Sequence, residues 1–331
     1  MPAYRVLITD RAWPDCEVER EILAAAGAEI IEAPQSDEET LVELARDCDA
    51  IGTCWANVSE AVVRAAVRCR VIARFGIGLD NISVWTATEL GIPVTCVPDY
   101  CVDEVAEHTL ALLLSLARRI PLFDARAKRG EYDRRIDPPL RRVSGQTLGL
   151  VGFGRIAQAV FRRSAGLGLN VIAHSPSGND HGTGCRMASL EELLSTSDFI
   201  SLHCPLTNAT RNLVGADQLA RMKPTAYLIN TSRGPLIDHT ALWDAIHSGQ
   251  IAGAGLDVFD PEPPDLSQPL FRDERVLVSP HAAFLSADSL HALRSRTARQ
   301  IADVLQLRRP EHLVNPDVWP QTIVARRERS E

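Results

Sequence analysis

The sequence predicts an α/β protein with two doubly wound parallel-sheet domains, one inserted into the other. A chain of 331 residues is longer than one hydrophobic core usually serves, so two domains of roughly 100 to 200 residues are expected. Short β-branched segments alternate with amphipathic helical segments twice along the chain, a pattern typical of parallel sheets covered by helices. A glycine-rich turn lies near mid-chain, at residues 152–157, so another segment of domain size must precede it.

The first α/β series occupies roughly the first 100 residues. Its first helix ends at Gly27, in the C-cap position where glycine is favoured. The clearest helical patterns are residues 18–26 and 41–46, and the predicted strands are residues 6–9, 29–32, 50–54, 71–75 and 94–97.

Residues 102–129 show a long helical pattern that is closed by Gly130. We expect one continuous helix that connects the two domains, with an apolar face that is available for a symmetric dimer. The apolar positions are Val105, Ala106, Leu110, Leu113, Leu114 and Ala117.

The second series follows, and the last helical pattern, residues 286–307, lies beyond it. We expect this last helix to return to the first domain, which gives domains of residues 1–100 with 286–331 and of residues 101–285. The predicted strands of the second series are 148–153, 170–174, 199–204, 226–230, 253–258 and 276–279, and its helices are 154–167, 190–196 and 240–248.

The composition argues against several classes of protein. A net charge of -8 and a pI near 5.6 do not suit a nucleic-acid surface. The longest strongly apolar segment, residues 110–117, is too short to span a bilayer, and the N-terminus lacks the apolar core of a signal peptide, so we expect a cytoplasmic protein. The eight cysteines include no CxxC pair, so we expect reduced thiols and no metal site.

The glycine-rich turn has the pattern GxGxxA. Gly152 permits a tight turn, Gly154 lets the backbone approach a pyrophosphate, and the following helix offers free amide donors. The pattern alone is weak, because many turns need glycine only for their geometry, but the predicted strand before it and helix after it strengthen it. The turn therefore predicts a dinucleotide site.

The end of the next predicted strand departs from the usual dinucleotide pattern. An acidic residue about 20 positions after the turn normally binds the ribose hydroxyls and selects NAD. Ser175 stands there instead, and no arginine follows at once to bind a 2′-phosphate. The choice between NAD and NADP is open at this point.

Polar side chains follow three predicted strands, at the sheet edge where ligands bind in this fold class. Arg233 can pair with a substrate carboxylate and polarise the adjacent carbonyl, and His281 can pass a proton to or from the substrate oxygen. Glu262, bonded to the histidine, would fix its tautomer. These groups suit a hydride-transfer site.

The order of these motifs resembles the D-isomer-specific 2-hydroxyacid dehydrogenases over roughly residues 5 to 316, most closely the branch of the C-terminal-binding proteins. The resemblance implies a Rossmann cofactor domain inserted in a flavodoxin-like substrate domain, with Arg233, Glu262 and His281 as the catalytic residues. The matching segments are residues 74–81, 99–110, 152–157, 231–234, 255–262 and 279–283.

The resemblance also implies a substrate pocket. Ile77 and Gly78 would offer backbone amides to the substrate carboxylate beside Arg233, and Arg74 and Trp55 would line the pocket. A surface salt bridge for Arg74 and core packing for Trp55 are each as acceptable as a role in substrate binding. Phe284 replaces a tryptophan of the C-terminal-binding branch, so that branch's substrate preference is not carried over.

The cofactor residues follow from the same resemblance, which slightly favours NAD(H) over NADP(H). The glycine turn would hold the pyrophosphate, and Thr109 would reach it too. Residues 204–206 and Thr210 would flank the adenosine side, and Thr231 and Asp257 would meet the nicotinamide end. The predicted cofactor-binding residues are Thr109, Gly152, Phe153, Gly154, Arg155, Ile156, Ser175, Cys204, Pro205, Thr210, Thr231, Ser232 and Asp257.

The sequence therefore predicts a homodimeric oxidoreductase that interconverts a small 2-oxo acid and a D-2-hydroxy acid. A formate dehydrogenase would carry an amide in place of Glu262, and a phosphite dehydrogenase would carry a lysine within residues 74–81, where Ile77 stands. The alternative from another class is an NAD(H)-sensing protein of the corepressor type with little turnover. Such a sensor has no physical need for all three catalytic side chains, so their presence favours the enzyme.

Overall fold

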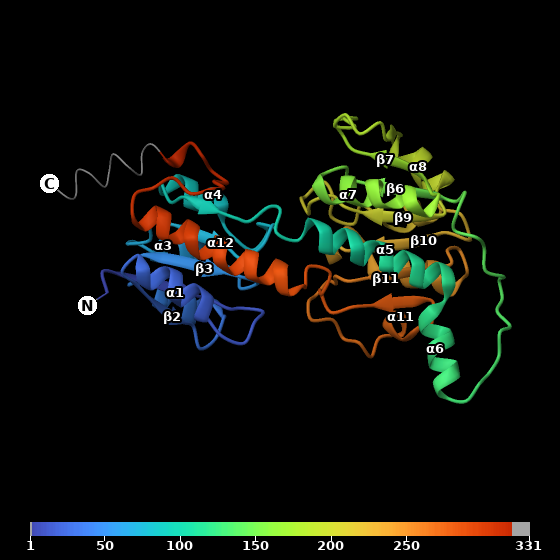
Figure 1. Ribbon diagram of the computed structural model, residues 1–331, viewed down its shortest axis with the longest axis horizontal. Coiled ribbons are helices and arrows are strands. Elements are labelled where there is room, and N and C mark those ends of the chain that lie inside the picture. The colour runs from blue at the N-terminus through green and yellow to red at the C-terminus, as the bar shows by residue number, and fades with distance from the viewer. Residues whose placement is uncertain (1, 320–331) are drawn as a thin grey trace. The chain divides into compact units, whose positions relative to one another are not determined.

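The structure is a computed structural model that describes residues 2–319 (Figure 1). The chain divides into two compact units. The first contains residues up to Tyr100 together with those from Ser286 onward, and the second contains Cys101–Leu285. Both units are built on a parallel sheet covered by helices, which confirms the predicted fold class.

The sheet of the first unit has five strands in the order β2-β1-β3-β4-β5, the flavodoxin-like order. All of its strand pairs are parallel. The strands are β1 Tyr4–Ile8, β2 Ala28–Glu32, β3 Ala50–Thr53, β4 Ile72–Arg74 and β5 Val94–Thr95, and the helices are α1 Glu17–Ala25, α2 Glu38–Ala45, α3 Glu60–Ala65, α4 Val84–Glu89 and α12 Ala287–Leu305.

Helices cover both faces of this first sheet. On one face, Leu23 of α1 packs with Ile301 and Val304 of α12 in a single buried cluster, and Figure 1 shows α12 beside α1. On the other face, Leu41 of α2 and Val62 of α3 belong to a second buried cluster. The last long helix therefore completes the core of the first unit.

The second unit has a seven-stranded sheet in the order β12-β11-β10-β9-β6-β7-β8. Strands β6 to β11 follow the strand order of a Rossmann fold. Its strand pairs are all parallel. The strands are β6 Thr147–Val151, β7 Asn170–His174, β8 Arg186–Met187, β9 Phe199–Leu202, β10 Tyr227–Asn230, β11 Gly253–Leu256 and β12 Val276–Val278. The α-helices are α5 Val102–Arg118, α6 Ile120–Lys128, α7 Arg155–Ser164, α8 Leu190–Thr196, α9 Ala216–Leu219, α10 His239–His247 and α11 Pro269–Arg272, and short 3-10 helices are Ala165–Leu167 and Gly234–Leu236.

The prediction of one continuous helix over residues 102–129 is wrong. Arg119 adopts the left-handed conformation, with φ of 51°, and separates α5 from α6. Pro121 explains the break, because in a continuous helix its ring would clash with the carbonyl of residue 117. Proline is instead accepted in the first turn of the new helix α6.

The prediction that this helix offers an apolar face for a symmetric dimer is also wrong. Its apolar residues Leu110, Leu113 and Ala117 are buried in the core of the second unit, together with Leu148 of β6 and Val160 of α7. Because the unit's own core covers this face, α5 does not offer it to another chain.

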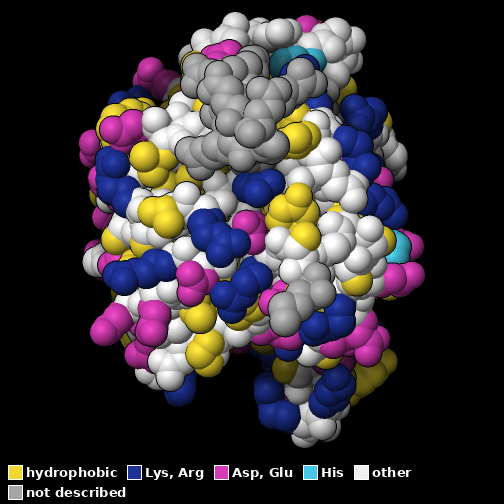
Figure 2. All heavy atoms as spheres, turned by 90° about the vertical axis from the view of Figure 1, so that its left-hand side faces the viewer, with side chains coloured by type: hydrophobic (Ala, Val, Ile, Leu, Met, Phe, Trp, Pro, Cys, Tyr) yellow, Lys and Arg dark blue, Asp and Glu magenta, His cyan; other side chains and the backbone are white. Residues whose placement is uncertain are grey.

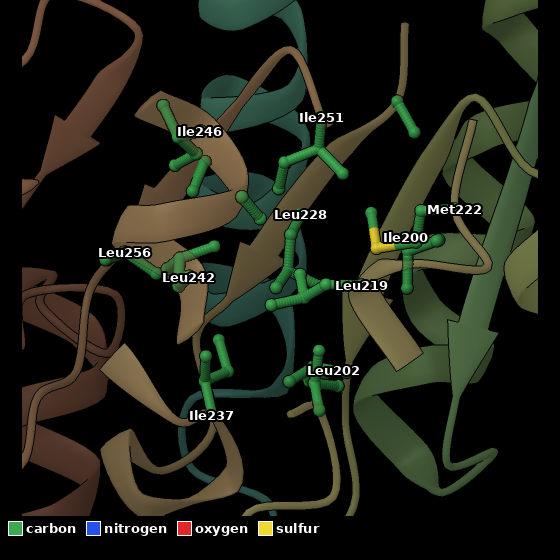
Figure 3. Close-up of a cluster of buried hydrophobic side chains, with 14 of the residues drawn as sticks. Ile200, Leu202, Leu219, Met222, Leu228, Ile237, Leu242, Ile246, Ile251 and Leu256 are labelled. Carbon is green, nitrogen blue, oxygen red and sulfur yellow. The ribbon is translucent and has the colours of Figure 1, made fainter. Parts of the chain in front are cut away.

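The opposite face of the second sheet carries the larger apolar cluster (Figure 3). Ile200, Leu228 and Leu256 come from the neighbouring strands β9, β10 and β11, and Leu242 and Ile246 of α10 pack onto them. These apolar layers fix the strand ends from which the polar loops begin.

The face of the molecule that Figure 2 shows carries basic and acidic side chains interspersed, with hydrophobic side chains between them. No helix within residues 2–319 is long and apolar enough to cross a membrane.

Candidate active site

The glycine turn joins β6 to α7, and Gly152 occupies its tightest position. Gly152 has φ of 90°, and its amide donates to the carbonyl of His174 at 2.8 Å. A Cβ atom at Gly152 would lie 2.7 Å from the backbone of His203 and Cys204, just beyond β9. Glycine is required here both for the left-handed backbone and for the close approach of the neighbouring strand end.

The next positions leave the N-terminus of α7 open. Gly154 is exposed, and an added Cβ would have no atom within 4 Å. Arg155, the first residue of α7, is exposed as well. Phe153 is only 3% exposed and packs on Phe161, so it offers a ligand its backbone rather than its ring. The backbone amides at the start of α7 and the open space around Gly154 suit a pyrophosphate, so the turn fits a dinucleotide.

The predicted ribose position follows β7. Ser175 is partly exposed, and its hydroxyl lies 3.2 Å from that of Ser177. Neither side chain carries a charge, so neither repels a 2′-phosphate nor forms an ion pair with it.

The predicted adenosine side is a loop that its own hydrogen bonds hold. The Thr210 hydroxyl donates to the Pro205 carbonyl at 2.7 Å and accepts from the Thr207 amide at 2.7 Å. Burial raises the pKa of the Cys204 thiol to about 11, so this thiol is protonated at neutral pH.

Thr109 of α5, which we expected to reach the pyrophosphate, lies beside Thr231 after β10, which we expected to meet the nicotinamide. Their hydroxyls are 3.0 Å apart, and both side chains are buried. The neighbouring Ser232 hydroxyl donates to the Leu202 carbonyl at 2.7 Å. Residues 122 positions apart thus meet at one edge of the Rossmann sheet.

Asn230 shapes the loop that presents Arg233, a role that the sequence analysis missed. It is fully buried, its amide nitrogen donates to the Arg233 carbonyl at 2.8 Å, and its oxygen accepts from the Ser232 amide at 3.0 Å. The signal was an asparagine at a strand end, where its side chain often replaces backbone hydrogen bonds in a turn.

Gly234 lets the Arg233 loop approach the loop that carries Glu262. A Cβ at Gly234 would lie 1.9 Å from the Phe259 carbonyl oxygen, so no larger residue fits without a backbone shift. The approach brings the Arg233 charge close enough to contribute to lowering the pKa of Glu262.

His281 and Glu262 form the central pair of the site. His281 Nδ1 lies 2.8 Å from Glu262 Oε2, and the other carboxylate oxygen accepts from the Phe259 amide at 2.8 Å. Burial acts to raise the pKa of Glu262, but the hydrogen bond and charge of His281, the Phe259 amide and the Arg233 charge outweigh it, so this pKa lies below its usual range. The three predicted catalytic residues are therefore brought together.

Asp257 holds the loop that carries His281. It is fully buried, and its carboxylate accepts from the Ser279 hydroxyl at 2.6 Å and from the amides of Ala282 and Ala283 at 2.9 Å each. Its own carbonyl accepts from the His281 amide at 2.8 Å. These contacts give Asp257 a positioning role in the loop, and its predicted contact with the cofactor stays a prediction.

Phe284 lies beside the catalytic histidine. Its ring is edge-on to the His281 imidazole with centroids 6.1 Å apart, and it is 8% exposed. An apolar ring at this position limits the room on one side of the imidazole.

The predicted substrate residues of the first unit lie at the ends of β3 and β4. Arg74 is 7% exposed and donates to the carbonyls of Gly78, at 3.0 Å, and of Phe75, so it braces the loop that contains Ile77 and is not a surface salt bridge. Trp55 is 44% exposed, which excludes core packing for its side chain.

Asp10 fixes the backbone next to Trp55. Its carboxylate accepts from the amides of Cys54, at 2.9 Å, and Trp55, at 2.6 Å. The sequence analysis missed this role, and an aspartate directly after the first strand was the available signal. Within residues 2–319, no group of His, Cys, Asp and Glu side chains could hold a metal ion.

The Rossmann sheet, its open glycine turn and the adjacent Arg-Glu-His cluster define a nicotinamide-linked oxidoreductase of 2-oxo and 2-hydroxy acids. Residues 110–283 match the family model described as D-isomer specific 2-hydroxyacid dehydrogenase, NAD binding domain. The chain belongs to the D-isomer-specific 2-hydroxyacid dehydrogenase family.

Relatives with curated names are similar over most of the chain. A glyoxylate reductase of Korarchaeum cryptofilum is 40% identical over 87% of this chain and 88% of its own length. A D-3-phosphoglycerate dehydrogenase of Methanocaldococcus jannaschii is 38% identical over 96% of this chain and 60% of its own length. Among solved structures, a D-lactate dehydrogenase from Aquifex aeolicus complexed with NAD and lactic acid has a TM-score of 0.85 at 26% identity, covering 94% of this chain and 99% of that chain.

These relatives are named as enzymes, which favours the enzyme over the NAD(H) sensor. They also carry names other than C-terminal-binding protein, so the family is established while the resemblance to that branch is not supported by them.

Proposed function

We propose that this enzyme reduces glyoxylate or a similarly small 2-oxo acid to the corresponding 2-hydroxy acid. The observation that carries the proposal is the His281–Glu262 hydrogen bond beside Arg233, at the edge of a Rossmann sheet. Several relatives named glyoxylate reductase, at 36% to 40% identity over at least 84% of this chain, support glyoxylate as the first substrate to test.

The proposed chemistry divides among three side chains. A bound nicotinamide cofactor supplies the hydride. Arg233 binds the substrate carboxylate and orients the carbonyl carbon. Because His281 Nδ1 bonds to Glu262, its Nε2 is the nitrogen that delivers a proton to the carbonyl oxygen. Glu262 fixes the ring orientation and stabilises the imidazolium form.

The first unit supplies substrate-binding groups in this proposal. The amides of Ile77 and Gly78 bind the carboxylate, and Arg74 holds their loop through the Gly78 and Phe75 carbonyls. Trp55 and Phe284 limit the size of the group that the substrate carries on its carbonyl carbon. The proposed cofactor contacts are those named from the sequence, from Thr109 to Asp257.

We propose NAD(H) as the preferred cofactor, in keeping with the slight preference drawn from the sequence. Ser175 leaves the 2′ position uncharged, so the preference should be modest. Ser175→Asp should raise the ratio of kcat/KM for NADH to that for NADPH, because a carboxylate binds the ribose hydroxyls and repels a 2′-phosphate. The homodimer and the cytoplasmic location also remain proposals, and the dimer uses a surface other than the buried face of α5.

The decisive experiment follows oxidation of NADH and of NADPH with glyoxylate, pyruvate, hydroxypyruvate and larger 2-oxo acids. Turnover that is fastest with glyoxylate supports the proposal. Turnover only with larger acids contradicts the substrate assignment, and no turnover together with tight cofactor-dependent dimerisation favours the sensor.

A further inference from the structure

We infer that His108 is a positioning residue for the acid/base histidine, acting on His281 through Ser279 and Asp257. The inference rests on the proposed role of His281. His108 lies on α5, far from His281 in sequence, and neither the chemistry of the strand ends nor the family resemblance assigned it a task.

The contacts form a chain of three side chains. His108 Nε2 is 2.9 Å from Ser279 Oγ and 3.6 Å from Asp257 Oδ1. Ser279 Oγ is in turn 2.6 Å from Asp257 Oδ1. All three residues belong to the second unit, so this series of contacts lies within one compact body.

The direction of these hydrogen bonds follows from proton counting. A carboxylate only accepts, so the single Ser279 hydroxyl proton points to Asp257. The Ser279 oxygen then accepts from His108, which must carry a proton on Nε2. His108 is thereby the donor that fixes the rotation of the Ser279 hydroxyl.

Asp257 connects this series of hydrogen bonds to the loop that carries His281. Its carboxylate holds the loop on both sides of His281, through Ser279 before it and through the amides of Ala282 and Ala283 after it. His108 Nε2 lies 3.6 Å from the same carboxylate oxygen that Ser279 contacts, so all three side chains meet at Oδ1. A hydrogen bond from Ser279, itself oriented by His108, therefore stabilises a fully buried carboxylate.

The loop needs such support because His281 has a left-handed backbone, with φ of 50°. This conformation is uncommon for a residue with a side chain and persists only where its surroundings impose it. A looser clamp would let the imidazole leave the orientation in which Nδ1 meets Glu262. His108 therefore affects the chemical step without touching the substrate.

The test compares His108→Leu with His108→Gln. Leucine removes the donor, whereas the amide of glutamine can donate to Ser279 from nearly the same position. We expect His108→Leu to lower kcat for glyoxylate about tenfold, the size expected for one lost hydrogen bond of a partly buried pair. The KM for glyoxylate and the KM for the cofactor should each stay within about twofold of the wild type. His108→Gln should recover most of kcat. His291→Leu, at an exposed histidine of α12, is the matched control and should match the wild type.

Unchanged kcat in His108→Leu would overturn the inference, as would a loss of kcat that glutamine does not restore. A rise in KM with unchanged kcat would also overturn it, because it would place His108 in binding. Ser279→Ala should lower kcat similarly, and the double variant should be no worse than either single variant. Fully additive effects would contradict a shared chain.

A readout without turnover separates this inference from the proposed function. In protein labelled with 15N-histidine, His108 should show a protonated Nε2 that loses its hydrogen-bond shift in Ser279→Ala. An Nε2 without a proton would overturn the chain of donors even in an active enzyme. If the wild type turns over no 2-oxo acid, the proposed function fails, while the protonation of His108 is still decided by this spectrum.

Discussion

His281 Nδ1 and Glu262 Oε2 lie 2.8 Å apart, and this contact joins the loops that follow β12 and β11. The loop after β10 brings Arg233 to the same place, pressed there by the close packing of Gly234 on Phe259. Three neighbouring strands thus each contribute one functional group, as parallel sheets allow at their carboxyl edge.

Removal of the imidazole should abolish turnover while cofactor binding survives. We expect His281→Ala to lower kcat by about 10²- to 10⁴-fold, since a positioned acid/base group typically contributes that much. Titration of NADH fluorescence should give a Kd within about twofold of the wild type. Equal activity in this variant would remove His281 from the mechanism.

The Glu262 carboxylate should make stability depend on pH in the acid range. Its folded pKa is lower than the usual 4.5, so its contribution to the free energy of unfolding is complete above that pH and is lost as the pH falls through the folded value. Urea unfolding of the wild type and of Glu262→Gln between pH 6 and pH 3.5 measures this. The difference between the two proteins should shrink below pH 4.5, and a difference that grows there would contradict the assignment.

The guanidinium of Arg233 should be needed for substrate rather than for cofactor. Arg233→Gln should cost about 2 kcal/mol or more in kcat/KM for the 2-oxo acid, because the substrate carboxylate loses its charged partner. Arg233→Lys should recover only part, since an ammonium cannot form the two parallel hydrogen bonds. The Kd for NADH should change little in both variants.

Arg272→Gln, at an exposed residue of α11, is the control for the loss of a positive charge. It should leave kcat/KM near that of the wild type. Equal losses in the Arg272 and Arg233 variants would indicate a general effect of charge rather than a specific contact.

The two glycines of the turn should respond differently to alanine. Gly152→Ala should destabilise the protein by about 1–3 kcal/mol, because the methyl group meets the backbone of His203 and Cys204 and the backbone has φ of 90°. Gly154→Ala should cost less than about 1 kcal/mol, because its surroundings are open. Thermal unfolding measures both.

Affinity for the cofactor gives the complementary measurement. Gly154→Ala should weaken NADH binding at least about tenfold, because its methyl group stands where the pyrophosphate approaches the backbone. A variant that is stable and binds NADH normally would show that the cofactor phosphates do not contact this position.

The regular elements were largely predictable, because apolar periodicity determines them. Residues 170–174 and 190–196 were predicted with the bounds that β7 and α8 have. The helix predicted at 41–46 begins earlier, at Glu38, because the Asp37 side chain accepts from the Thr40 amide at 3.0 Å. A polar cap can extend a helix by a turn beyond its apolar positions, and the apolar pattern does not show where that turn begins. Short elements such as α4, α9 and β8 lack a periodic pattern long enough to detect.

The candidate site was predictable as far as it depends on strand ends. Arg233, Glu262 and His281 were placed there from the sequence, and the structure brings them together. The contacts of Asp257 depend on packing against a loop 22 to 26 residues away, which no local pattern encodes. The break at Arg119 was signalled by Pro121, because the apolar positions that indicated the helix end at Ala117.

The position of α12 has a consequence for synthesis of the protein. The helix supplies Leu293, Ile301 and Val304 to the core of the first unit, yet it follows all of Cys101–Leu285 in the chain. On the ribosome, the second unit can therefore finish folding while the first still exposes one face of its sheet. The nascent first unit must wait, partly open, for the last helix to emerge, and this interval is when the chain is most exposed to aggregation and to chaperones.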